Sequence, residues 1–194
     1  MKFKWTSSRI IFIKFIVSLF IVGIIFGFIF YSNESNLIKT NIINEITNLK
    51  EYLILTRQNN FLYHIILLSV LTVLSLLVIG LPIILFYFFY EGVSFGYLLA
   101  ALFHINGIDG LFFGIIFSLI NKLFIYLALI YLIYTSYHYS KSVIISARNK
   151  NYQISSYISK HLFRIILIFL FVILFDVFIY FLGNKIVGYF IFLL

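Results

Sequence analysis

The sequence has no cysteine, a single proline and only six acidic residues among 194. The absence of cysteine excludes disulfide bonds, a thiolate nucleophile and cysteine-ligated metal centres. Charged residues make up only 10% of the chain, against about 25% in soluble domains, which excludes an ordinary globular protein. Aromatic residues reach 21%, and this excludes a disordered chain, because disordered chains contain few aromatics.

Apolar residues, in contrast, make up 63% of the chain, and they occur in runs long enough to cross a hydrocarbon core of about 30 Å. We therefore predict an all-α fold, a multi-pass integral membrane helix bundle that forms a single domain over residues 1–194. The net charge of +8 would suggest nucleic acid in a soluble protein. In a membrane protein it more simply marks the cytosolic loops, so we expect contact with membrane lipids and no nucleic-acid partner.

The N-terminal apolar run is interpreted as a permanent anchor. Lys2, Lys4 and Arg9 precede an apolar stretch over residues 10–31. This stretch is longer than the roughly 7–15 apolar residues of a cleaved signal peptide. We expect it to cross the membrane with its N-terminus in the cytosol.

Two polar stretches predict the topology. Residues 32–60 carry three basic and three acidic side chains, whereas residues 139–164 carry five basic side chains and no acid. Because positive loops remain inside, the segment 32–60 is expected outside and a loop over 139–161 in the cytosol. Between an outer and an inner segment the chain must cross the membrane an odd number of times, and the length of residues 61–138 suits three crossings. The five predicted transmembrane helices are about 10–31, 61–80, 83–105, 111–137 and 162–183, with an extracytoplasmic C-terminus.

Two turn signals divide the middle of the chain. Gly80-Leu81-Pro82 places a glycine where one helix would end and a proline where the next would begin. Asn106-Gly107-Ile108-Asp109-Gly110 is rich in turn residues. A competing division breaks at Glu91-Gly92, but it leaves a piece over 92–105 that is too short to span alone. We favour the first division.

The outer segment 32–60 is predicted to contain an amphipathic helix. Ile42, Ile46, Leu49 and Leu53 recur at spacings of three and four residues. One interpretation is a helix that lies on the outer leaflet or caps the bundle. The other is a docking face for an extracytoplasmic partner. The two interpretations are compatible.

Three ionisable residues fall near the middle of predicted spans, on three different helices: Glu91, Lys122 and Asp176, with Asn121 beside the lysine. Each charge costs at least about 2.5–3.5 kcal/mol at the bilayer centre unless it is paired or hydrated. We expect an internal ion pair with Lys122. We favour a structural role, in which these polar side chains hold the helices together, over a proton or ion path. One lysine and two acids are few groups for a proton relay.

Three Gly-x-x-x-Gly pairs occur on three predicted helices. Such pairs let helix backbones approach closely in lipid, and internal packing is favoured over a homodimer or partner interface, which stays open. The predicted helix-packing residues are Gly23, Gly27, Gly80, Pro82, Gly92, Gly96, Gly110 and Gly114.

The sequence shows no catalytic constellation. His64, His138 and His161 are scattered and have no metal-ligand spacing. Nucleophile-elbow, zinc-protease and Walker motifs are absent. We predict a protein that is not an enzyme and needs no cofactor or metal.

The stretch 80–128 resembles the stage II sporulation protein M family. The residues that carry the resemblance are Gly80-Leu81-Pro82-Ile83-Ile84-Leu85, Gly92-Val93-Ser94-Phe95-Gly96, Asn106-Gly107-Ile108-Asp109-Gly110 and the polar interruption at Asn121. The chain departs from the family at Leu119-Ile120-Asn121-Lys122, near which a proline is usual.

The resemblance implies a non-enzymatic scaffold in the septal or mother-cell membrane during endospore formation. It implies as partners the membrane-anchored cell-wall hydrolases that resemble stage II sporulation proteins P and D and that drive engulfment. The richness in Ile, Asn, Lys, Phe and Tyr suits a low-GC Gram-positive bacterium. The alternative function is a small-solute or ion transporter component that uses the intramembrane polar residues.

Overall fold

The computed structural model describes residues 7–55, 61–77, 79–148 and 154–190, and the described residues form helices without any strand. The helices are α1 (Ser7–Asn33), α2 (Asn36–Leu55), α3 (Phe61–Leu76), α4 (Gly80–Arg148) and α5 (Ile154–Phe190). The prediction of an all-helical fold is confirmed for these residues.

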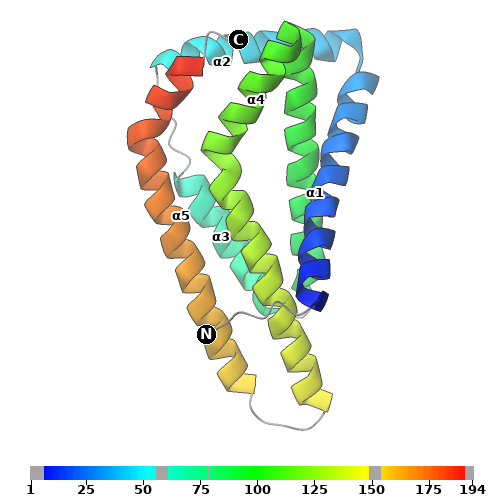
Figure 1. The fold of residues 1–194 in the computed structure, drawn as a ribbon, viewed down its shortest axis with the longest axis vertical. Coiled ribbons are helices and arrows are strands. Elements are labelled where there is room, and N and C mark those ends of the chain that lie inside the picture. Colours follow the sequence, from blue (N-terminus) through cyan, green and yellow to red (C-terminus); the bar gives the residue numbers. More distant parts are fainter. Residues whose placement is uncertain (1–6, 56–60, 78, 149–153, 191–194) are drawn as a thin grey trace.

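The long helix α4 consists of two antiparallel halves. Asn106 and Gly107 leave helical geometry, and Gly107 has φ 60° and ψ −132°, a conformation open essentially only to glycine. The chain reverses there, so residues 80–105 (the first half) and residues 108–148 (the second half) run side by side (Figure 1). The break lies inside the predicted turn cluster 106–110, and the helix runs unbroken through the competing position at Glu91-Gly92.

The bundle is built around α4. α1 packs along the first half of α4, whereas α3 and α5 also pack against α4 and against each other. α2 lies across one end of the bundle, and the last turns of α4 and the first turns of α5 lie at the other end (Figure 1). Two apolar cores result. One lies among α1, α3, α4 and α5. The other lies beneath α2, between the end of α1 and the parts of α4 close to its break.

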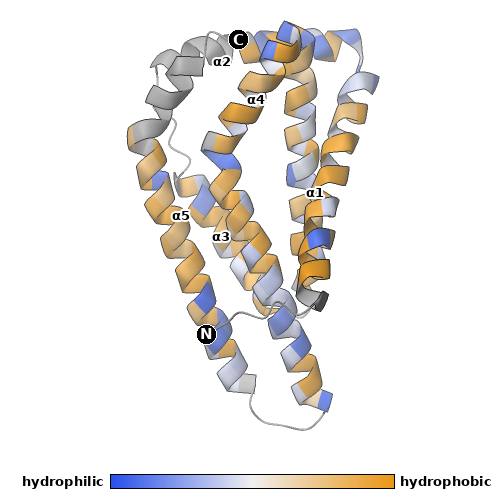
Figure 2. Ribbon diagram, in the orientation of Figure 1, coloured by the Kyte–Doolittle hydropathy of each residue, from blue (hydrophilic) through white to orange (hydrophobic). Residues whose placement is uncertain are grey.

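Hydropathy follows this arrangement. The long stretches of α1, α3, α4 and α5 are mainly hydrophobic, and hydrophilic residues gather on α2 and at the opposite ends of α4 and α5 (Figure 2). By length and composition three described helical segments could cross a membrane: Ile10–Asn33, Gly80–Leu119 and Ser155–Ile179. The chain therefore has the build of an integral membrane protein.

The helix boundaries correct several predicted ones. α3 has 16 residues, about 24 Å at 1.5 Å per residue, so it is shorter than the predicted crossing 61–80 and than a hydrocarbon core. It also begins well below α2 (Figure 1). The turn from α3 into α4 is tight. It brings Gly80 against the carbonyl oxygen of Leu74, where a side chain would not fit.

The predicted cytosolic loop 139–161 is mostly helical, because α4 continues to Arg148 and α5 begins at Ile154. α5 also continues past Gly183, the predicted end of the last span, to Phe190. The predicted ends were too early because hydropathy identifies only the part of a helix that is apolar enough for lipid. The helix itself can continue into water until a residue breaks it. Residues 191–194 of the predicted outer tail lie outside the described residues.

Candidate functional site

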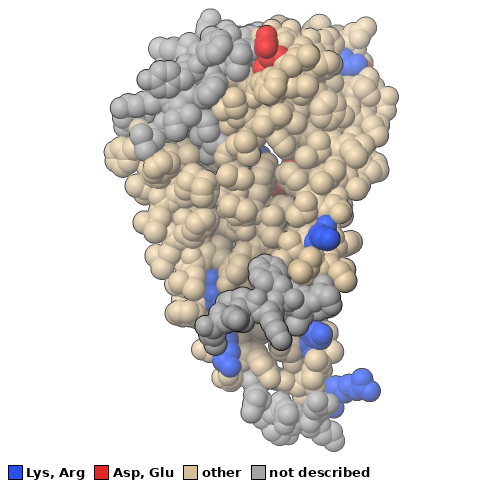
Figure 3. Space-filling view, in the orientation of Figure 1, with Lys and Arg blue, Asp and Glu red and all other residues tan. Residues whose placement is uncertain are grey.

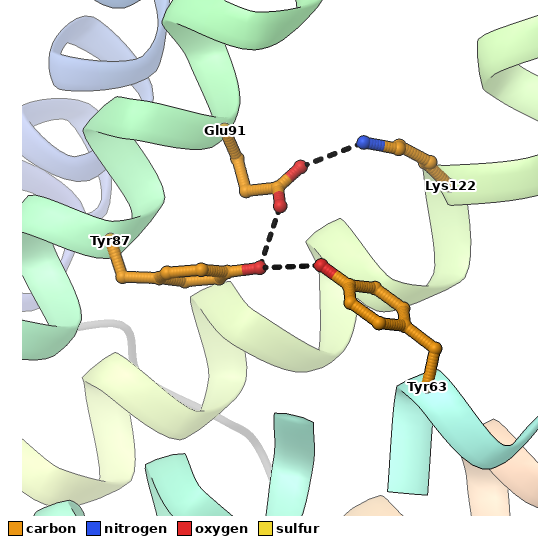
Figure 4. Close-up of polar contacts among 4 residues, drawn as sticks. All are labelled: Tyr63, Tyr87, Glu91 and Lys122. Atoms are coloured by element: carbon orange, nitrogen blue, oxygen red, sulfur yellow. Dashed lines mark hydrogen bonds and ion pairs between the residues drawn. The ribbon is translucent and has the colours of Figure 1, made fainter. Parts of the chain in front are cut away.

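The predicted intramembrane polar residues form contacts that join several helices. The Glu91 cluster consists of Tyr63 from α3, Tyr87 and Glu91 from the first half of α4, and Lys122 from the second half (Figure 4). The Lys122 Nζ donates a hydrogen bond to Glu91 Oε2 at 3.0 Å, and the Tyr87 hydroxyl donates to Glu91 Oε1 at 2.6 Å. Both carboxylate oxygens of Glu91 are therefore bonded.

The tyrosines extend this cluster to α3. The hydroxyls of Tyr63 and Tyr87 lie 3.4 Å apart. Since the single proton of the Tyr87 hydroxyl goes to Glu91, the Tyr63 hydroxyl is the donor in this contact. The cluster thus connects both halves of α4 with the first turn of α3.

Burial in the Glu91–Lys122 pair is uneven. The Glu91 side chain is 8% exposed, whereas that of Lys122 is 40% exposed. Lys122 also lines a cavity of about 260 Å³ beneath α2, together with Glu45 and Ser118. A carboxylate buried this deeply needs its cationic partner, because the low dielectric of the interior makes an unpaired charge costly.

Asp176 lies outside the Glu91 cluster, so the prediction that groups the two acids is wrong on this point. His64 Nδ1 contacts both carboxylate oxygens of Asp176, at 2.8 and 3.0 Å, and this joins α3 to α5. Both side chains are largely buried. Asp176 also lies at the first turn of α3, where the helix dipole favours a negative charge.

The two polar groups meet at the start of α3. Tyr63 and His64 are neighbours in the chain, with ring centroids 5.8 Å apart. Among the residues that the structure describes, no hydrogen bond connects the Glu91 cluster to the His64–Asp176 pair. Together they form a polar layer that links α3, both halves of α4 and α5. Asn121 does not take part, because its side-chain amide donates to the carbonyl of Phe117, one turn back on its own helix.

Sequence reasoning missed Tyr63, His64 and Tyr87. Tyr87 precedes Glu91 by one helical turn, a spacing at which side chains meet, so its role was readable from the sequence. His64 falls near the outer end of its predicted span and Asp176 in the outer half of its own. A comparison of how deep the two side chains lie in the membrane along their predicted spans could have paired them.

The predicted packing glycines lie at close helix contacts. Gly23 and Gly27 of α1 face Gly92 and Gly96 of α4, so that the two Gly-x-x-x-Gly pairs are opposed. A Cβ atom on Gly23 would lie 2.5 Å from the carbonyl oxygen of Phe89, and one on Gly27 would overlap the carbonyl oxygen of Val93. These glycines are thus enclosed between α1 and α4.

The third glycine pair lies between the two halves of α4. A Cβ atom on Gly110 would overlap the backbone of Leu102, whereas one on Gly114 would meet only leucine side-chain ends. Pro82 stands in the first turn of α4, where its missing N–H leaves no hydrogen bond unmade.

Two of the four α2 residues predicted as a candidate partner face contact the bundle instead. Ile46 is only 8% exposed and packs in a core with Tyr31, Ala101 and Phe113, and Ile42 packs against the same core. This arrangement corresponds to the interpretation in which α2 caps the bundle. The side chains of Leu49 and Leu53 lie outside the described residues.

In comparisons with known proteins, no family model, no curated protein and no solved structure matches the chain. Among the described residues, no group of three or more His, Asp or Glu side chains could hold a metal ion.

Proposed function

We propose that the chain is a non-enzymatic, multi-pass integral membrane scaffold that positions a partner at the outer face of the membrane. The observation that carries this proposal is the use of its intramembrane acids: each is held by a side chain of another helical segment, Glu91 by Lys122 and Asp176 by His64. Polar contacts of this kind stabilise helix packing in lipid. They give a bundle with a defined shape.

The outward face of α2 is the surface that the scaffold offers. Leu37 is 71% exposed and lies nine residues before the buried Ile46, which places it on the opposite side of a helix with 3.6 residues per turn. Asn41, one turn after Leu37, is exposed on the same side. A partner at the outer face would meet these residues and not Ile42 or Ile46.

The resemblance to the stage II sporulation protein M family supplies the biological setting of the proposal. In that setting the chain lies in the septal or mother-cell membrane of a low-GC Gram-positive bacterium. Its partners are membrane-anchored wall hydrolases resembling stage II sporulation proteins P and D, recruited for septal wall thinning and engulfment.

The test is site-specific photo-cross-linking in the cells that make the protein. A photoreactive residue at Asn41 is expected to capture such a hydrolase, whereas the same residue at Ile144, exposed at the far end of the bundle, is expected to capture none. In a second arm, Leu37→Glu is expected to delocalise a fluorescent hydrolase while the scaffold keeps its normal abundance. Normal hydrolase localisation in Leu37→Glu cells, with no capture from Asn41, would refute the proposal.

A second candidate function, a component of a small-solute or ion transporter, is favoured by one observation. Lys122 is half-exposed to the cavity beneath α2 while it contacts the buried Glu91. Lys122→Met separates the two functions. A scaffold loses only stability with this change, whereas a transporter reconstituted in vesicles loses flux at normal abundance.

A further inference from the structure

A groove with a polar end and an apolar end lies between the second half of α4 and α5. Its polar end is a cavity of about 530 Å³ that includes Tyr134 and Arg164. Its apolar end is a hollow of about 290 Å³ that includes Leu127 and Leu167. Tyr131 lines both, so the two parts adjoin along the pair of helices.

The polar end carries positive charge without a matching acid. Lys160 and Arg164, one turn apart on α5, line it, and none of the described residues that line it is acidic. The two ion pairs among the described residues lie elsewhere, at Glu91 and Asp176. Figure 3 shows lysines and arginines gathered over the lower ends of α4 and α5, far from the acidic side chains near α2. This end of the groove suits an anion.

A buried histidine in the same wall has an unused hydrogen-bonding atom. His161 is 2% exposed and lines the polar end of the groove. Its ring stacks on Tyr139, with centroids 4.6 Å apart, and its Nε2 lies 3.1 Å from the Ser75 hydroxyl. Its Nδ1 has no partner among the described residues. Buried polar atoms are nearly always paired, but this one is enclosed by the protein, so His161 forms part of the wall of the polar end and does not present Nδ1 to the cavity.

The apolar end determines which kind of anion fits. Leu127, Leu167 and Phe171 line it and are exposed. Leu167 and Phe171 continue the α5 face that carries Lys160 and Arg164, and Leu127 belongs to α4. A free phosphate or a nucleotide has no group for such a surface. A phospholipid has both parts, because its headgroup is anionic and its acyl chain is apolar. Basic pockets between transmembrane helices on the cytoplasmic side bind anionic headgroups.

We propose that the groove binds an anionic phospholipid. Lys160 and Arg164 contact its phosphate, and one acyl chain lies along Leu127, Leu167 and Phe171. This site is independent of whether the chain serves as a scaffold or a transporter, since it requires only insertion in a membrane.

The test is native mass spectrometry of the full chain released from detergent micelles. The probes are phosphatidylglycerol and phosphatidylcholine with identical acyl chains. Wild-type protein is expected to retain phosphatidylglycerol at least about tenfold more strongly than phosphatidylcholine, because each basic residue attracts an anionic headgroup. The double variant Lys160→Gln/Arg164→Gln is expected to lose this preference.

The matched control is Lys141→Gln/Arg148→Gln, which removes the same charge at the same end of the bundle from residues outside the groove lining. It is expected to retain the preference, as is the charge-conserving Arg164→Lys. A third variant, Leu127→Trp, fills the apolar end and is expected to weaken lipid retention although all the charges remain. Circular dichroism verifies that each variant is folded.

Equal retention of the two lipids by wild type would overturn the proposal, and so would equal losses in the groove and control double variants. Displacement of phosphatidylglycerol by millimolar inorganic phosphate would assign the site to a free phosphate and would also overturn it. Retention of phosphatidylglycerol in the presence of phosphate supports the lipid.

Discussion

Gly23 of α1 and Gly92 of α4 lie in backbone contact, so that a Cβ atom added to Gly92 would approach the Cα of Gly23 to 3.3 Å. The same relation holds one turn further on, between Gly27 and the segment at Gly96. At these glycines the backbones of α1 and the first half of α4 therefore meet directly. Dispersion contacts and close backbone approach, not expulsion of water, stabilise such a pair in lipid.

Gly27→Ala is expected to destabilise the protein. The added methyl would meet the backbone of Val93 and Tyr97, which cannot move without separating α1 from α4, and overpacking of this kind costs about 1–3 kcal/mol. The measurement is the free energy of unfolding in mixed micelles. Gly114→Ala is the matched control, because its methyl meets only the mobile ends of Leu99 and Leu102. Equal losses in the two variants would contradict this account of the contact.

The Glu91–Lys122 pair is tested by a double-mutant cycle. Lys122→Met is expected to cost about 1–3 kcal/mol, because among the described residues it leaves the buried carboxylate with Tyr87 as its only hydrogen-bond partner. Glu91→Gln/Lys122→Met is expected to recover part of this loss, since no charge then remains in the pair. Additive effects of the two single changes would show that the side chains do not interact.

The His64–Asp176 pair is expected to behave similarly between α3 and α5. Asp176→Leu leaves the buried His64 Nδ1 without its partner, at a cost of about 1–3 kcal/mol. The combination His64→Phe/Asp176→Leu replaces the pair by apolar side chains and is expected to lie closer to wild type. Thermal unfolding of the three variants in one detergent provides the comparison. A double variant less stable than Asp176→Leu alone would contradict this account of the His64–Asp176 pair.

The docking of α2 distinguishes Ile46 from Leu37. Ile46→Asp places a carboxylate in the core with Tyr31 and Phe113, and we expect α2 to detach, because burying an unpaired charge costs several kcal/mol. Leu37→Asp changes an exposed position and is expected to leave α2 in place. Hydrogen exchange over α2 measures the difference. Unchanged protection in Ile46→Asp would show that this face does not hold the helix.

The sequence was sufficient for the class of fold, for the turn at Asn106-Gly107 and for the amphipathic helix after α1. These features follow from local sequence signals. Apolar runs indicate the class of fold, an Asn-Gly pair indicates the turn, and apolar residues spaced by three and four indicate the amphipathic helix. Helix ends were predicted less well, because hydropathy shows where a helix suits lipid and not where it stops. Thus α4 and α5 continue through most of the expected loop.

Pairing across helices was predicted only in part. Lys122 was expected to form an ion pair, and Glu91 is its partner in the structure. The sequence pattern groups Asp176 with them because the three charges are counted as a set, but in the structure Asp176 contacts His64 of α3. The choice of partner thus depends on the depth and rotation of each helix, which a linear pattern does not contain.

The most direct test of the account is the sidedness of the two polar ends. Because the chain has no cysteine, Asn41→Cys and Lys141→Cys each introduce a single reactive thiol at an exposed position. A membrane-impermeant maleimide is expected to label Asn41→Cys in intact cells and Lys141→Cys only after the membrane is permeabilised. Labelling of both in intact cells, or of neither, would place α2 and the basic ends of α4 and α5 on one side and would contradict the account.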